Sequence, residues 1–137
     1  MELDSHIFAA RSPGKGEQNQ DSFPIMHFRN FPGLDAWMRQ KWDDQGKPLF
    51  NSSGTLVKYA ETEDETEWFH KYLVLGYEDL LDLEEAMELN RLDYTGTTQV
   101  DEKINDLRSA LNISFRAFPY GGPVLYTSTL LEPAHSN

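Results

Sequence analysis

Cysteine is absent from the 137-residue chain. Disulfide bonds, thiolate catalysis and cysteine-ligated metal sites are therefore excluded. Long hydrophobic runs are absent too, because the longest falls far short of the ~18 apolar residues that span a bilayer. The first residues, Met1-Glu2-Leu3-Asp4, are acidic where a secretory signal needs basic residues followed by an apolar stretch. We expect a cytoplasmic protein that does not enter a membrane.

The common catalytic and cofactor motifs are also missing. The loop at 12–17 is rich in glycine, but a phosphate-binding loop aligned on it would need Gly at Ala9 and Ser or Thr at Gly16. Neither a His-Glu-x-x-His motif nor a nucleophile elbow is present. The acidic stretch 61–67 lacks the central Gly of a calcium loop. We predict no catalytic residue, no metal site and no cofactor.

Apolar residues, in contrast, are frequent enough to build a core. They make up 39% of the chain, and seventeen residues are aromatic, which argues against intrinsic disorder. The formal net charge is -11 and the isoelectric point is about 4.6. A protein of this charge is repelled by nucleic acid and by anionic membranes. We therefore expect no direct nucleic-acid binding, and we expect a basic protein as partner.

The negative charge is concentrated in one segment. Between residues 61 and 106 there are fifteen carboxylates and three bases, a net charge of -12, whereas the rest of the chain carries +1. A charge imbalance that is confined to one segment indicates a distinct surface rather than a general adaptation for solubility.

Hydrophobic spacing predicts a mixed fold. Period-two patterns and turn residues predict strands at 6–10, 23–28, 55–59, 113–118 and 124–131. Three- and four-residue spacing predicts helices at 34–42, 62–75, about 78–92 and 101–111. We expect a single α+β domain over residues 1–131, with about four helices packed on a small, mainly antiparallel sheet of four to five strands. Residues 132–137 are expected to form a flexible tail.

Two of these expectations depend on residues that typically mark the ends of helices and strands. Thr62 and Glu65 have the spacing of a capping box, and Gly76 suits a helix C-terminus, so we place a helix between them. The Pro119-Tyr-Gly-Gly-Pro123 segment suits a hairpin turn between the last two predicted strands.

The acidic helices are the predicted binding site. On the helix after Gly76 some carboxylates share one face and others form a neighbouring stripe, and a further patch lies near the capping box. The predicted partner-binding residues are Glu63, Asp64, Glu67, Glu78, Asp82, Glu84, Glu85 and Glu88. Rows of carboxylates can imitate a phosphate backbone. We therefore expect a non-enzymatic acidic protein that occupies a basic surface of a partner, such as one that binds nucleic acid, in the manner of an inhibitor, immunity or antidefence protein.

Two alternatives stay open. One is a small enzyme with dispersed active-site residues, in which His27, His70 and carboxylates combine in a cleft lined by residues 120–126. The other is a structural or assembly subunit, in which the predicted hairpin 113–131 offers an edge for strand addition, with Ser114, Thr127 and Thr129 at the interface. The sequence leaves the oligomeric state open, with a homodimer as one option.

Overall fold

The computed structural model describes residues 2–10, 22–117 and 123–131. It contains strands β1 (Glu2–Ala9), β2 (Phe23–Arg29), β3 (Pro48–Phe50), β4 (Leu56–Tyr59), β5 (Tyr72–Leu75) and β6 (Val124–Leu131). Its helices are α1 (Pro32–Asp44), α2 (Tyr77–Glu88) and α3 (Val100–Ala117), with a single 3-10 turn at Asp64–Thr66.

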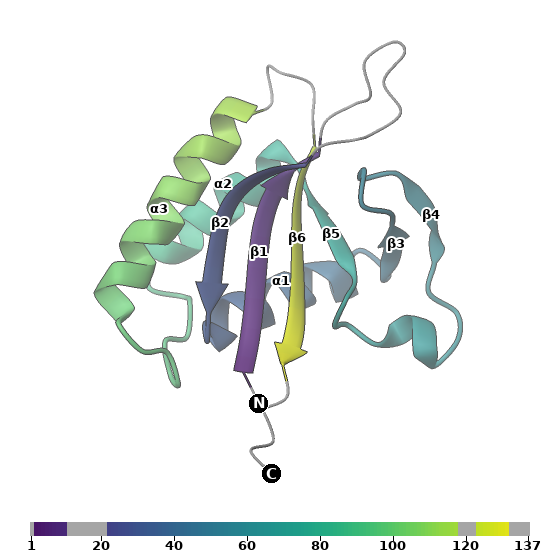
Figure 1. The fold of residues 1–137 in the computed structure, drawn as a ribbon, viewed down its shortest axis with the longest axis horizontal. Coiled ribbons are helices and arrows are strands. Elements are labelled where there is room, and N and C mark those ends of the chain that lie inside the picture. The colour runs from purple at the N-terminus through teal and green to yellow at the C-terminus, as the bar shows by residue number, and fades with distance from the viewer. Residues whose placement is uncertain (1, 11–21, 118–122, 132–137) are drawn as a thin grey trace.

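Four strands form an antiparallel sheet in the order β2-β1-β6-β5. Figure 1 looks onto the uncovered face of this sheet, and the three helices lie behind it and along its β2 side. A separate two-stranded sheet, β3 paired with β4, lies beyond β5. The sheet therefore has one face for the core and one open face.

Alternation along β1 assigns its side chains to the two faces. Ser5 and Ile7 are buried beneath the helices, whereas His6 is exposed and Asp4 is half-buried on the other side. Because successive strand residues point to opposite faces, Asp4 and His6 lie on the open face together.

The core lies between the sheet and the helices. Fully buried side chains come from every layer, among them Phe28, Leu73, Tyr126, Leu34, Trp42, Leu83 and Leu107. Gly33, in the first turn of α1, tightens this packing, because a Cβ atom there would lie 1.7 Å from the backbone oxygen of Asp93. Any other residue at position 33 would push α1 away from the connection between α2 and α3.

A buried polar network crosses the core. The Asp35 carboxylate, on α1, accepts hydrogen bonds from the Tyr126 hydroxyl at 2.7 Å and from Nε1 of Trp68 at 3.0 Å. The Tyr126 hydroxyl also lies 2.9 Å from Oγ of Ser5. Burial, and then the nearby charge of Asp35, raise the pKa of Tyr126 well above 10. The network fixes α1 to the central strands.

The helix predicted at 62–75 is wrong. The capping-box hydrogen bonds do form, since Thr62 N–H donates to Glu65 at 3.0 Å and Glu65 N–H donates to Thr62 Oγ1 at 3.3 Å, but only the 3-10 turn follows. The chain is then extended as β5, in which Leu73 and Leu75 alternate into the core. Gly76 precedes α2 instead of ending a helix. Pairing with β6 thus outweighs the local helix signal.

The strand predicted at 113–118 is also wrong, because α3 continues to Ala117. Leu107, Leu111 and Ser114 extend the buried helical stripe, and the Ser114 hydroxyl donates to the Ala110 carbonyl at 2.7 Å within the helix. Ile113, the first residue of the predicted strand, lies exposed on the helix surface.

The α+β class with a four-stranded antiparallel sheet is confirmed, but the described residues hold three α-helices rather than about four, and a second small sheet. The loop at 11–21, most of the predicted hairpin turn and the predicted tail at 132–137 lie outside the described residues. Of the helices described, none has the length and apolar character needed to cross a membrane.

Candidate functional site

The acidic row predicted after Gly76 lies on α2, with its carboxylates on the surface. Glu78, Asp82, Glu85 and Glu88 are exposed, and Glu84 is half-buried. The opposite side of the helix packs into the core through Leu80 and Leu83. The helix starts with a favourable arrangement, because Gly76 N–H donates to the Asp79 carboxylate at 2.9 Å.

Bases neutralise this row only in part. Lys41, on α1, lies 2.6 Å from the Asp82 carboxylate and 3.7 Å from that of Asp79. Arg108 lines a small hollow of about 180 Å³ with Glu84 and Glu88. No salt bridge joins Glu78, Glu85 or Glu88 to another of the residues that the structure describes. Asp82 is thus held in place, whereas no ion pair with a described residue offsets the charge of these three glutamates.

Two leucines are exposed among these carboxylates. Leu81 is 41% exposed and Leu89, just after the helix, is 52% exposed. At 3.6 residues per turn both lie on the same side of α2 as Glu78 and Glu85. The outer surface of α2 therefore combines negative charge with apolar area.

The second acidic patch lies elsewhere. Glu63, Asp64 and Glu67 are exposed around the 3-10 turn, which lies below the β3–β4 pair in Figure 1, on the other side of the molecule from α2. Beside them, Lys58 lies 3.0 Å from Glu65 and, with backbone N–H donors at Thr62 and Glu61, lowers the pKa of Glu65 to about 2. The structure does not bring the two predicted patches together.

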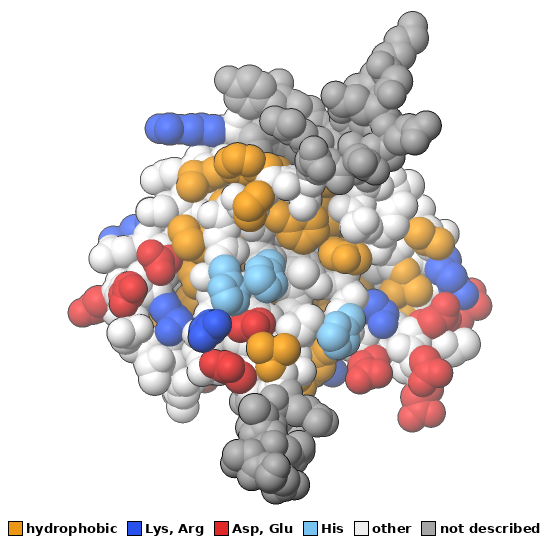
Figure 2. Space-filling view, viewed as in Figure 1, with side chains coloured by type: hydrophobic (Ala, Val, Ile, Leu, Met, Phe, Trp, Pro, Cys, Tyr) orange, Lys and Arg blue, Asp and Glu red, His pale blue; other side chains and the backbone are white. Residues whose placement is uncertain are grey.

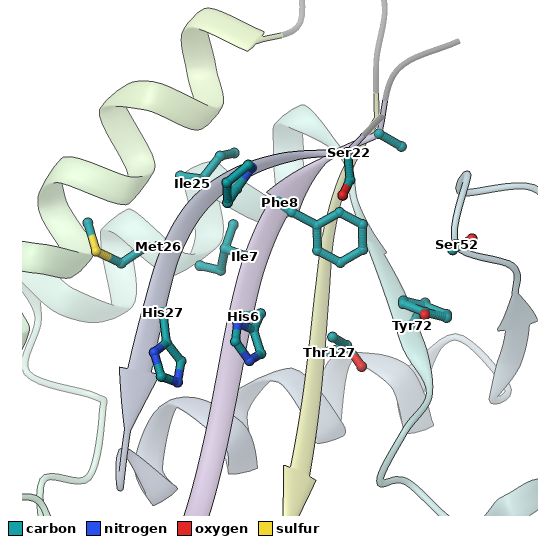
Figure 3. Close-up of a pocket in the computed structure, with 12 residues that line it drawn as sticks. His6, Ile7, Phe8, Ser22, Ile25, Met26, His27, Ser52, Tyr72 and Thr127 are labelled. Atoms are coloured by element: carbon teal, nitrogen blue, oxygen red, sulfur yellow. The ribbon is translucent and has the colours of Figure 1, made fainter. Parts of the chain in front are cut away.

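The open face of the sheet has a hollow that the sequence did not reveal. Its volume is about 690 Å³, within the range of small-molecule sites. His27, His6, Thr127 and Tyr72 line it from four adjacent strands, and Phe8 and Ser52 lie at its upper side (Figure 3). Figure 2 shows two neighbouring histidines in the middle of this face, below a band of hydrophobic side chains.

The histidines in the hollow form a cluster with Asp4. His6 pairs directly with His27 across β1 and β2, and their parallel rings stack with centroids 4.4 Å apart. Nε2 of His27 lies 3.1 Å from Oδ1 of Asp4. Burial, and then the neighbouring charge of His27, lower the pKa of His6, while Asp4 opposes that shift. Both causes favour the neutral form of His6.

The sequence prediction missed this cluster. An Asp-x-His pair on a strand places both side chains on one face, so residues 4 and 6 carried a usable signal. His27 could be added only from the pairing of β1 with β2. The residues proposed for a dispersed active site separate, because His70 does not line the hollow and Tyr126 is buried in the core, while position 120 lies outside the described residues.

The edge predicted for strand addition does not form in the described residues of the segment 113–131. β6 lies between β1 and β5, so both of its sides are already paired, and Ser114 is buried in α3. Thr127 and Thr129 are on the open face of the sheet and not at its edge.

Comparisons with known proteins identify no relative: no protein-family model, no curated protein and no solved structure matches the chain.

Proposed function

We propose that the chain is a non-enzymatic acidic binding protein that occupies a basic surface of a partner protein, in the manner of an inhibitor, immunity or antidefence protein. The observation that carries this proposal is the outer surface of α2, where Glu78, Glu85 and Glu88 surround the exposed Leu81 and Leu89. Carboxylates would steer a basic partner and set its orientation, and the leucines would supply apolar contact area.

The energetics of α2 support a role for these charges beyond solubility. Glu85 and Glu88 are three residues apart in the last turn, which holds no base, so they repel each other and also face the negative end of the helix dipole. Replacing both by Gln should therefore stabilise the fold by a few tenths of a kcal/mol. A local arrangement that costs stability is typical of sites where function and stability are in conflict.

The test compares two variants of equal charge change. In one, Glu78, Glu85 and Glu88 are replaced by Gln. In the matched control, Glu63→Gln, Asp64→Asn and Glu67→Gln remove three charges near the 3-10 turn. Proteins from a lysate of the source cells are captured on wild type and on both variants over a salt series and identified by mass spectrometry.

We expect a stoichiometric basic partner that is captured by wild type and by the control, leaves at high salt, and is lost from the α2 variant. With the purified partner, the α2 variant should associate ~10-fold more slowly or worse at low salt. Equal capture by the α2 variant and the control would reject α2 as the contact surface.

A second candidate function is a small enzyme that uses the open face. The hollow of about 690 Å³ with its two histidines favours it. The distinguishing observation is a small molecule that copurifies with wild type, detected by native mass spectrometry, and is lost in His27→Gln while the α2 variant retains it.

A further inference from the structure

The cluster of Asp4, His6 and His27 is built by strand pairing alone. Asp4 and His6 are two residues apart on β1, and His27 is the direct partner of His6 on β2. The potential ligand atoms of all three side chains lie within 4.8 Å of one another. Since all three residues are on strands of one sheet, their backbones hold this arrangement rigidly.

The cluster has imidazole nitrogens that its internal contacts do not use. The His27–Asp4 contact accounts for one imidazole nitrogen, whereas neither ring nitrogen of His6 has a hydrogen-bond partner among the residues that the structure describes. A neutral imidazole has a lone pair that can bind a metal ion.

The surrounding charges permit a cation. Arg29 is the strand partner of Asp4, but no salt bridge between them exists within the described part of the chain, so the carboxylate stays available. Thr129 and Thr127, the partners of Asp4 and His6 on β6, are uncharged, as is Tyr72 beyond them. The high overall negative charge of the chain also attracts cations.

We propose that Asp4, His6 and His27 bind one divalent transition-metal ion of the Zn²⁺ type, with the remaining coordination position open to the hollow. Two imidazoles and one carboxylate form a donor set that Zn²⁺ accepts in three-ligand sites with an exchangeable fourth position. In such a site the ligand atoms are ~3.3 Å apart. The Asp4–His27 pair, at 3.1 Å, already meets this spacing. His6, whose ligand atom lies within 4.8 Å of theirs, would have to turn out of its stack on His27 to become the third ligand.

This proposal is independent of the proposed function, because the cluster lies on the open face of the sheet and α2 lies behind it (Figure 1). The charge-removal variants of α2 should therefore bind metal like wild type. Failure of one proposal leaves the other standing.

Calorimetric titration of the full chain with ZnCl₂ tests the site. The buffer contains excess Mg²⁺, so that surface carboxylates, which prefer hard cations, are occupied. We expect one Zn²⁺ per chain. His6→Gln, His27→Gln and Asp4→Asn should each weaken binding by at least the ~10–100-fold that loss of a mere second-shell partner causes. The matched control is His70→Asn, which removes an exposed histidine outside the hollow and suits its positive φ of 69°.

A second measurement avoids dependence on the variants. In histidine side-chain NMR spectra of wild type, Zn²⁺ should change the ring nitrogen signals of His6 and His27 and leave those of His70 unchanged. Absence of stoichiometric binding, unchanged affinity in His6→Gln and His27→Gln, or equal loss in His70→Asn would each overturn the proposal.

Discussion

Each face of the sheet carries a carboxylate beside ring side chains, and the two groupings differ in chemistry and in access. Behind the sheet, Asp35 accepts hydrogen bonds from Tyr126 and Trp68, whose side chains are fully buried. On the open face, Asp4 contacts His27, whose side chain is 41% exposed. Indole and phenol groups donate hydrogen bonds, whereas a neutral imidazole also offers a lone pair. The first grouping therefore stabilises the fold, and the second is suited to bind a ligand.

The largest expected effect is on the free energy of unfolding, and it tests whether the buried grouping around Asp35 stabilises the fold. Asp35→Ala leaves the Tyr126 hydroxyl and the Trp68 indole without their buried acceptor, which should lower the free energy of unfolding by about 2–5 kcal/mol. Asp4→Ala breaks a contact with an exposed histidine and should lower it by less than about 1 kcal/mol. Urea denaturation followed by tryptophan fluorescence measures both. Equal losses would remove the distinction between the two carboxylates.

The second prediction concerns Tyr126. Tyr126→Phe removes a hydrogen bond to a charged acceptor and should cost about 1.5–3 kcal/mol at neutral pH. The pKa of folded Tyr126 is well above 10, so on raising the pH the unfolded chain loses this proton first. The unfolded state then binds fewer protons, and the free energy of unfolding of wild type falls as the pH rises above 10. Tyr126→Phe should show a shallower fall, and parallel curves for the two proteins would contradict the assignment.

The third prediction concerns the pKa of His6 on the open face, where the expected effect is smaller. The positive charge of His27 contributes to the lowered pKa of His6, and Asp4 opposes it. His27→Gln should therefore raise the pKa of His6, but not fully to 6.5, because partial burial persists. Asp4→Asn should lower that pKa further. NMR titration of the ring protons measures both, and shifts in the opposite directions would show that the cluster is not arranged as described.

The smallest expected effect is on the pKa of a third carboxylate, that of Glu65, near the surface. Lys58→Gln should raise the pKa of Glu65 from about 2 toward 4.5, since the Lys58 contact is the largest cause of its shift. The backbone donors at Thr62 and Glu61 remain, so the pKa should stay below 4.5. Any contribution of Glu65 to the free energy of unfolding is lost only as the pH falls from 4.5 to about 2. NMR titration of the Glu65 side chain checks the shift, with Lys47→Gln as a control that leaves it unchanged.

Elements with strong periodicity could be predicted from the sequence. The apolar residues 34, 38 and 42 predicted α1, and period-two patterns predicted β2, β6 and the half of β1 that starts at His6. The segment 62–75 could not be predicted correctly, because its end signals fit a helix and only pairing of β5 with β6 decides its conformation. The strand predicted at 113–118 is wrong for the same reason, because tertiary packing continues α3 to Ala117.

The two candidate sites, on α2 and on the open face of the sheet, also differed in how far the sequence predicts them. The carboxylates of α2 could be predicted because a helical face follows from spacing within one element. Lys41, which holds Asp82, could not, since the two residues are forty-one positions apart in the sequence. The Asp4, His6 and His27 cluster needed the register between two strands, which no local pattern contains.

The alternation along β1 also has a consequence for folding errors. A slip of one residue against its neighbours would turn Asp4 and His6 toward the helices and move Ile7 to the solvent. Burying an unpaired carboxylate is costly, so the polar residues of the open face disfavour a misaligned sheet whether or not they bind a ligand. Replacing Asp4 and His6 by Val would keep a strand-forming sequence but remove this free-energy cost. Misaligned, aggregation-prone species would then be more populated.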